Sequence, residues 1–90
     1  MGVTELEKYR ASIDNLDAAL VHVLAERFRV THEVGLLKQR EGIPPADPER
    51  ERDQLNRLKE IALGAGLDPA VVEAVFPLIM AEVRRRHSSL

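Results

Sequence analysis

Residues 4–41 read TELEKYRASIDNLDAALVHVLAERFRVTHEVGLLKQRE, and this stretch decides the fold. Thr4 and Glu7 have the spacing of a capping box, in which each side chain hydrogen-bonds the other residue's free backbone N–H at a helix start. Apolar residues then recur at alternating steps of three and four, the period of one helix face. This apolar stripe consists of Leu6, Tyr9, Ile13, Leu16, Leu20, Val23, Val30, Val34 and Leu37. Because this stretch contains no proline and no glycine other than Gly35, we predict one helix from Thr4 to about Glu41.

Glycine and proline then separate the first helix from a second one. Gly42 and the pair Pro44-Pro45 end the first helix, because glycine favours a helix C-terminus and proline cannot continue it. Asp47-Pro48 follows with the features of an N-cap and a first helical residue. The second helix is expected to end at Gly64 or Gly66. Its apolar residues are Leu55, Leu58 and Ile61.

Asp68-Pro69 repeats this start signal and opens a third helix, which extends towards His87. Its apolar residues are Val71, Val72, Val75, Phe76, Ile79, Met80 and Val83. Pro77 lies inside this helix and is expected to remove one backbone hydrogen bond or to kink the axis. Since no segment alternates in the manner of a strand, the sequence predicts an all-α fold of three helices in a single domain, residues 1–90.

The first helix is too long for this chain to bury alone. At 1.5 Å per residue it extends roughly 57 Å, against about 30 Å for the diameter of a small domain. A chain of 90 residues buries only about 60–65% of its unfolded surface, and without cysteine it has no disulfide to compensate. A second copy of the chain would cover the stripe, so we expect an intertwined helical homodimer.

Composition argues against several classes of function. The chain has 13 basic and 15 acidic residues and a net charge of -2, whereas a nucleic-acid module usually shows a basic excess. No apolar run approaches the ~20 residues of a membrane span, and residues 1–5 lack the features of a secretory signal. A cytoplasmic protein is therefore expected. The chain has no Gly-rich phosphate loop, no Cys/His cluster and no nucleophile beside a base, so we expect no metal and no cofactor. From the charge and the lack of an apolar run, we expect no nucleic acid and no membrane as a partner.

One cation interrupts the apolar stripe. When the first helix is written in heptads with Leu6 at position a, Arg27 also falls at position a. Arg27 either packs its stem and pairs with Glu26 or Glu33, or it binds a ligand. Lys38 follows eleven residues later, on the same face and about 16 Å away, so a small organic dianion lying along the helix could be held at both ends.

Two further arginines extend this basic site. Arg10 lies about 25 Å from Arg27 along the helix and roughly 100° around it, so in an antiparallel or crossed dimer it could enter the site of the partner subunit. Arg50 lies in the first turn of the second helix, where a cation opposes the helix dipole. Arg50 therefore either serves a function other than helix stability or belongs to a group of solvated charges of both signs. The basic end at residues 84–87 is favourable for the dipole alone. His22 and His32 fall outside the stripe and are expected in solvent.

Together these features resemble the all-helical chorismate mutases over nearly the whole chain. The specific parts are residues 9–17 (YRASIDNLD), residues 25–27 (AER), Lys38, and the Asp-x-x-Arg-Glu run from Asp47 to Glu51. The resemblance implies an intertwined dimer of three-helix chains with two equivalent sites, each receiving one arginine from the partner. It also implies the Claisen rearrangement of chorismate to prephenate, which needs no nucleophile, metal or obligatory proton transfer.

The resemblance further implies roles for the basic residues. Arg27 and Arg10 of the partner subunit would bind the two substrate carboxylates, and Arg50 would assist on the ring side. Lys38 would lie against the ether oxygen of the breaking C–O bond. Preorganised charge of this kind lowers a barrier, and one aimed donor is typically worth ~3 kcal/mol.

The remaining site residues lie at the helix ends, and two of them depart from the family pattern. Asp47 and Glu51 would take up the ring hydroxyl and neighbouring polar contacts. His87 stands where well-known members carry a glutamine or glutamate facing the ether oxygen, and a histidine can still donate a hydrogen bond there. Val83 stands where some members have a hydroxyl. The catalytic residues implied are Lys38, His87 and Arg27.

Other functions are compatible with the same pattern. An isochorismate-pyruvate lyase and a 4-amino-4-deoxychorismate mutase use a similar basic pocket, although the acid pair Asp47 and Glu51 favours a mutase over the lyase. A non-catalytic helical dimerisation or regulatory module is the alternative of another class. Such a module has no use for a cation in its apolar stripe, so Arg27 argues against it.

Overall fold

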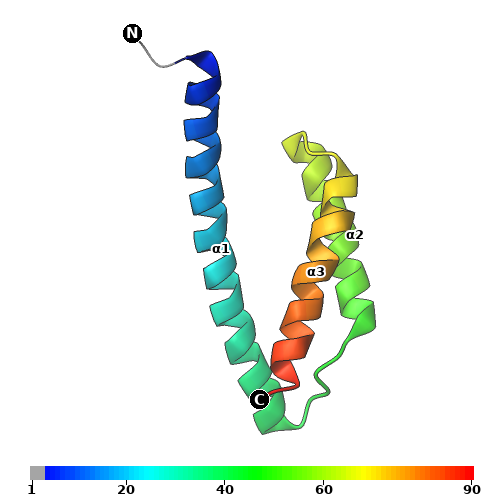
Figure 1. Cartoon of the computed structure of the whole chain (residues 1–90). Helices are drawn as coiled ribbons and strands as arrows, with labels where there is room; N and C mark the ends of the chain where they lie inside the picture. The colour runs from blue at the N-terminus through cyan, green and yellow to red at the C-terminus, as the bar shows by residue number, and fades with distance from the viewer. Residues whose placement is uncertain (1–3) are drawn as a thin grey trace. The chain divides into compact units, whose positions relative to one another are not determined.

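The computed structural model describes residues 4–90, which form three α-helices and no strand (Figure 1). The helices are α1 (Glu5–Glu41), α2 (Pro48–Ala65) and α3 (Pro69–His87). The prediction of an all-α fold with one long and two shorter helices is therefore confirmed. Residues 1–3, part of the N-terminal stretch searched for a secretory signal, lie outside the described residues.

The helix starts are made by the predicted capping residues. Thr4 and Glu7 exchange hydrogen bonds between side chain and backbone N–H at 3.3 and 3.2 Å, as a capping box requires. The side chains of Asp47 and Asp68 each accept a hydrogen bond from a backbone N–H in the first turn of α2 and α3, at 3.0 and 2.9 Å. These bonds satisfy N–H groups that have no partner within the helix.

Glycine ends the first two helices in the same way. Gly42 and Gly66 have φ angles of 68° and 74°, in the left-handed region that favours glycine. After each glycine, the backbone N–H of the next residue reaches a carbonyl five positions back, at 2.8 and 2.9 Å. This is the Schellman arrangement, and it fixes the points at which the chain leaves α1 and α2.

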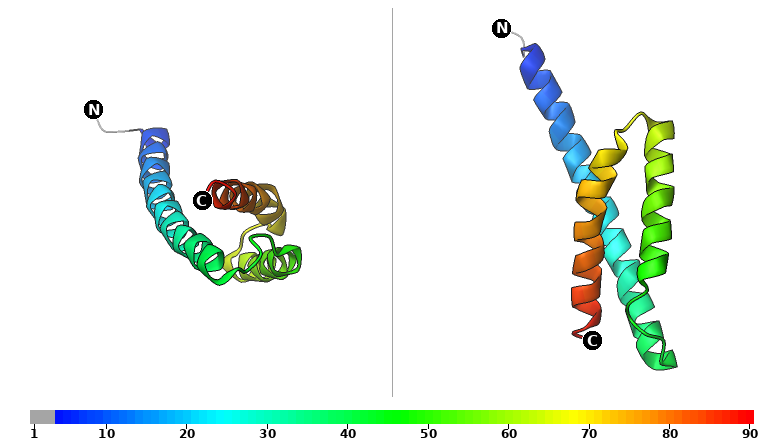
Figure 2. Two further views of the ribbon diagram at one scale, coloured as in Figure 1. Left: turned by 90° about the horizontal axis from the view of Figure 1, so that it is seen from below. Right: turned by 90° about the vertical axis from the view of Figure 1, so that its right-hand side faces the viewer.

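The described chain divides into two compact units, one ending at Thr31 and the other covering His32–Leu90. The first unit is the N-terminal part of α1. The second contains the last turns of α1 together with α2 and α3, which run antiparallel beside each other (Figures 1 and 2). Six of the eight predicted site residues lie in this second unit.

The buried core of the second unit is small. Its fully buried apolar residues are Ala62, Val72 and Met80. Ile61, which the sequence placed on the inner stripe of α2, is 54% exposed, because the packed face continues from Leu58 by a step of four to Ala62. α3 continues through Pro77, so the proline costs one backbone hydrogen bond without ending the helix.

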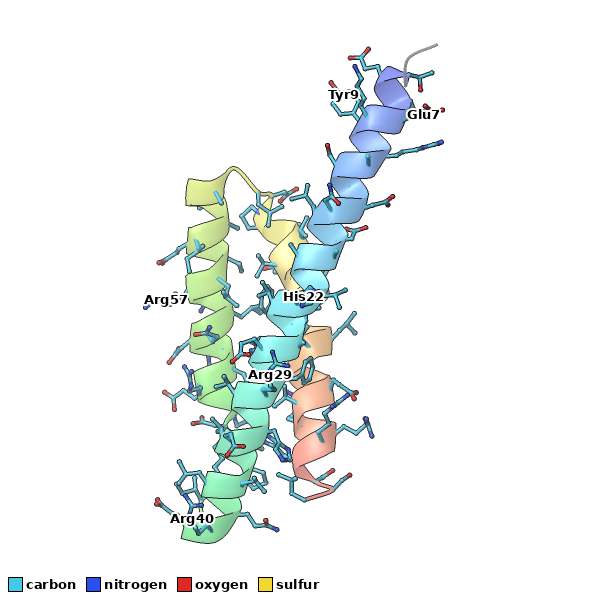
Figure 3. The ribbon with its side chains drawn as sticks, turned by 90° about the vertical axis from the view of Figure 1, so that its left-hand side faces the viewer. Glu7, Tyr9, His22, Arg29, Arg40 and Arg57 are labelled. Carbon is cyan, nitrogen blue, oxygen red and sulfur yellow. The ribbon has the colours of Figure 1, made fainter. Side chains whose placement is uncertain are left out.

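Much of the apolar stripe of α1 is open to solvent. Leu6, Leu16 and Val23 are 57%, 68% and 65% exposed, and Tyr9 of the same stripe, labelled in Figure 3, is 62% exposed. In the described part of the chain, no helix has the length and apolar character needed to cross a membrane.

Candidate active site

The eight predicted site residues are distributed over both units. Arg10 and Arg27 lie on α1 in the first unit. In the second unit, Lys38 lies in the last turn of α1, Asp47 caps α2, and Arg50 and Glu51 follow in its first turn. Val83 and His87, both half-buried, lie on the last turns of α3.

Arg27 is half-buried and has a donor without an acceptor. Its Nη1 atom is buried and has no hydrogen-bond partner among the described residues. Glu26, one of the two acids considered as its partner, instead pairs with Arg29 at 2.7 Å, and Figure 3 marks Arg29 on α1. A buried guanidinium N–H without an acceptor is costly, so an anion bound at this point would remove an unfavourable term.

The predicted site cations are among the cations that form no ion pair in the described chain, as are Lys8, Arg40, Arg52 and Arg57. The ion-paired cations of the described chain are Arg29, Lys59, Arg84, Arg85 and Arg86. Arg10, Arg27, Lys38 and Arg50 form no ion pair there. Lys38 makes only a long hydrogen bond of 3.5 Å, from Nζ to the carbonyl oxygen of Pro45. Their positive charge therefore remains available to an anionic ligand.

The acid Glu51 has a partner that the sequence did not indicate. Arg84 on α3 donates from Nη1 to Oε1 of Glu51 on α2, forming an ion pair between the two helices. The residues are 33 positions apart, and nothing in the helical periodicity gives the register between α2 and α3. Arg84 was interpreted only as a favourable charge at a helix C-terminus, so this contact was missed.

His87 lies directly over Gly35. A Cβ built on Gly35 would come within 2.7 and 2.8 Å of the imidazole Cδ2 and Nε2 atoms, closer than carbon atoms can pack. Gly35 therefore allows close packing within an unbroken helix. Gly35 precedes Lys38 by three residues, about one turn, so the imidazole lies on the part of α1 that carries Lys38.

The rest of the basic C-terminus is neutralised locally. Glu82 accepts hydrogen bonds from Arg85 at 2.6 Å and from Arg86 at 3.2 Å. These bonds lower the pKa of Glu82 from its usual 4.5 to about 2, and the bond from Arg85 has the larger effect. The arginines at this end are therefore paired with acids, which agrees with a structural role. His22 (labelled in Figure 3) and His32 are exposed, as expected.

The chain is similar to several known proteins. The family model described as chorismate mutase type II matches residues 9–88. The T-protein of Enterobacter agglomerans is 39% identical over 80 residues, which cover 89% of this chain and 21% of that protein. The chorismate mutase of Methanocaldococcus jannaschii is 27% identical over 78 residues, covering 87% of this chain and 79% of the relative.

A third relative carries a different name. The 4-amino-4-deoxychorismate mutase of Streptomyces venezuelae is 28% identical over 81 residues, covering 90% of this chain and 79% of that protein. This chain thus spans about a fifth of the length of the T-protein but most of the two smaller relatives. Since the family model covers nearly the whole described chain, the protein belongs to the type II chorismate mutase family.

Proposed function

We propose that the protein is a chorismate mutase that converts chorismate to prephenate. The observation that carries this proposal is the buried, unpartnered Nη1 of Arg27, which lies in an otherwise apolar stripe. A helix that only mediated dimerisation would gain stability from an apolar residue there, whereas an enzyme for a dicarboxylate needs a desolvated cation. The chorismate mutase of Methanocaldococcus jannaschii, which spans a similar length, supports the same activity.

The mechanism needs only binding and charge. In the rearrangement, the ether C–O bond of chorismate breaks while a new C–C bond forms, and no proton has to move. Arg27 and Arg10 of the partner subunit would hold the two carboxylates, with Arg50 on the ring side. Holding the folded conformer in this way restricts motion that would otherwise oppose the reaction.

Two groups would act on the ether oxygen. Lys38, which forms no ion pair in the described chain, would place positive charge where the oxygen gains negative charge. His87, held over Gly35 one turn away, would supply a second hydrogen bond. Asp47 and Glu51 would accept hydrogen bonds from the ring hydroxyl and its surroundings, while Val83 contributes only apolar contact.

The proposal includes a homodimer in which residues 1–90 form a single chorismate mutase domain. The exposed stripe on α1 supports this arrangement, since it is a long apolar surface that is open to solvent in the described chain. We also propose a cytoplasmic location, because the reaction serves the biosynthesis of aromatic amino acids.

The activity is tested by incubating the purified protein with chorismate and identifying the product. Prephenate is expected, and Arg27→Ala should lower kcat/KM by about 100-fold or more, as for other aimed donors. Arg29→Ala is the matched control, because Arg29 lies two residues away but pairs with Glu26. Wild-type protein without turnover, or equal losses in both variants, would contradict the proposal.

A mutase acting on 4-amino-4-deoxychorismate is the second candidate, favoured by the Streptomyces venezuelae relative. The same assay with this compound, and with isochorismate for the lyase alternative, separates the three reactions. Pyruvate and salicylate from isochorismate would identify the lyase, while turnover confined to the amino compound would identify the second candidate.

A further inference from the structure

The pair formed by Arg84 and Glu51 differs from the other contacts of the basic C-terminus. Arg85 and Arg86 both use Glu82 on their own helix, whereas Arg84 reaches from α3 to α2. The side chains of Arg84 and Glu51 are 44% and 30% exposed, so the pair is partly shielded from solvent. Partial shielding makes its charges act more strongly on a bound molecule than those of a fully exposed pair.

The position of Glu51 gives this pair a consequence for the ligand. Glu51 lies in the first turn of α2, beside Arg50 and one turn from the cap Asp47. In the proposed function on which this inference rests, the carboxylate of Glu51 faces the substituent at ring position 4. Arg84 occupies one carboxylate oxygen and leaves the other, Oε2, as an acceptor.

The net charge of the pair formed by Arg84 and Glu51 determines which ring substituent it attracts. An isolated carboxylate accepts a hydrogen bond from a hydroxyl, but it attracts an ammonium group much more strongly. The guanidinium of Arg84 offsets the negative charge, so the pair as a whole is close to neutral. A neutral hydroxyl still finds an acceptor there, while a protonated amine loses most of its electrostatic attraction to Glu51.

We propose that Arg84 is a specificity-determining residue, which makes this site favour a neutral hydroxyl over a cationic amine at ring position 4. Chorismate carries the hydroxyl and 4-amino-4-deoxychorismate carries the amine, which is protonated near neutral pH. Arg84 thus acts through Glu51 and need not touch the substrate.

The test compares the two ligands in Arg84→Gln at pH 7. The discrimination ratio is the inhibition constant of the amino compound in the chorismate assay divided by the KM for chorismate. It can be measured even where the amino compound is not turned over. Removing one unit charge beside Glu51 should shift this ratio towards the amine by about tenfold. Arg84→Lys keeps the charge and should retain the wild-type ratio. Glu51→Gln leaves Arg84 unopposed and should shift the ratio the other way.

Lys59→Gln is the matched control, because it breaks the other ion pair between α2 and α3. Lys59 pairs with Glu73 at 2.5 Å, and it lies eight residues, about 12 Å, beyond Glu51 on α2. This variant should leave the ratio within twofold of wild type. An unchanged ratio in Arg84→Gln, or an equal shift in Lys59→Gln, would overturn the inference while leaving the proposed function intact. Failure of the wild-type protein to convert chorismate would overturn the proposed function as well.

Should Arg84→Gln not fold, as judged by its helical circular dichroism, Arg84→Lys and Glu51→Gln still decide the question. Glu51→Gln with a wild-type ratio would show that the carboxylate does not face the ring substituent, and it would overturn the inference by itself.

Discussion

At the scale of single residues, the close packing around Gly35 depends on the absence of a side chain there. Gly35 lies within α1, where alanine would ordinarily be favoured by about 1 kcal/mol. The imidazole of His87 and the side chain of Leu90 together fill the space that an alanine methyl group would need. The glycine is therefore explained by what lies over it, because the backbone at this point is ordinary helix.

Gly35→Ala should lower kcat for the chorismate reaction by about tenfold while leaving helix content unchanged. The methyl group displaces the imidazole, and a shift of about 1 Å in a catalytic group can cost that much or more. The check is a double-mutant cycle with His87→Ala. Once the imidazole is gone, adding Gly35→Ala should have no further effect on kcat. Equal losses in the two backgrounds would show that Gly35 does not act through His87.

At the scale of the helices, the sequence predicted where they begin and end better than how they pair. The helix ends are set by capping residues that contact backbone groups within one or two turns, so the local sequence is enough to predict them. These residues are Asp47, Asp68, Gly42 and Gly66. The burial of Ala62 and the pairing of Arg84 with Glu51 depend on the register between α2 and α3, which no local pattern specifies. The same limit applies to the candidate site: the family motif indicates candidate residues, but it does not indicate that Arg84 on α3 pairs with Glu51.

The last turns of α3 carry a prediction about acid stability. The folded pKa of Glu82 is about 2, below its usual 4.5, so its pairing stabilises the fold fully above about pH 4.5. This stabilisation is lost as pH falls from 4.5 through 2. Glu82→Gln should therefore lower Tm slightly at pH 7, and the difference from wild type should vanish near pH 2. Because the pair is solvent-exposed, 1 M salt should also reduce it.

Glu60→Gln serves as the control for this measurement. Glu60 lies on α2 and belongs to no ion pair in residues 4–90, so its replacement should leave Tm nearly unchanged at pH 7. A Tm difference for Glu82→Gln that persists undiminished at pH 2 would mean that the side chain acts through packing and not through its charge.

At the scale of the whole molecule, the proposed dimer would explain both the exposed stripe on α1 and the separation of Arg10 from Arg27. The stripe on α1 needs a partner to cover it, and Arg10 lies on this helix too far from Arg27 to share a small ligand within one chain. In a two-fold dimer, the same residues are supplied to both sites by opposite chains. The proposed association would therefore complete the site as well as bury the apolar surface.

Subunit exchange tests whether the site is shared. Arg10→Ala and Arg27→Ala should each be nearly inactive alone, because every site lacks one carboxylate ligand. After equal mixing and exchange, half of the dimers pair one variant with the other, and in each of these one site contains both arginines. About a quarter of wild-type activity should then return, since one site in four is intact. The control mixes Arg10→Ala with the double variant, in which no combination restores a site. Recovery there as well, or none in the first mixture, would mean that Arg10 and Arg27 do not meet across a dimer.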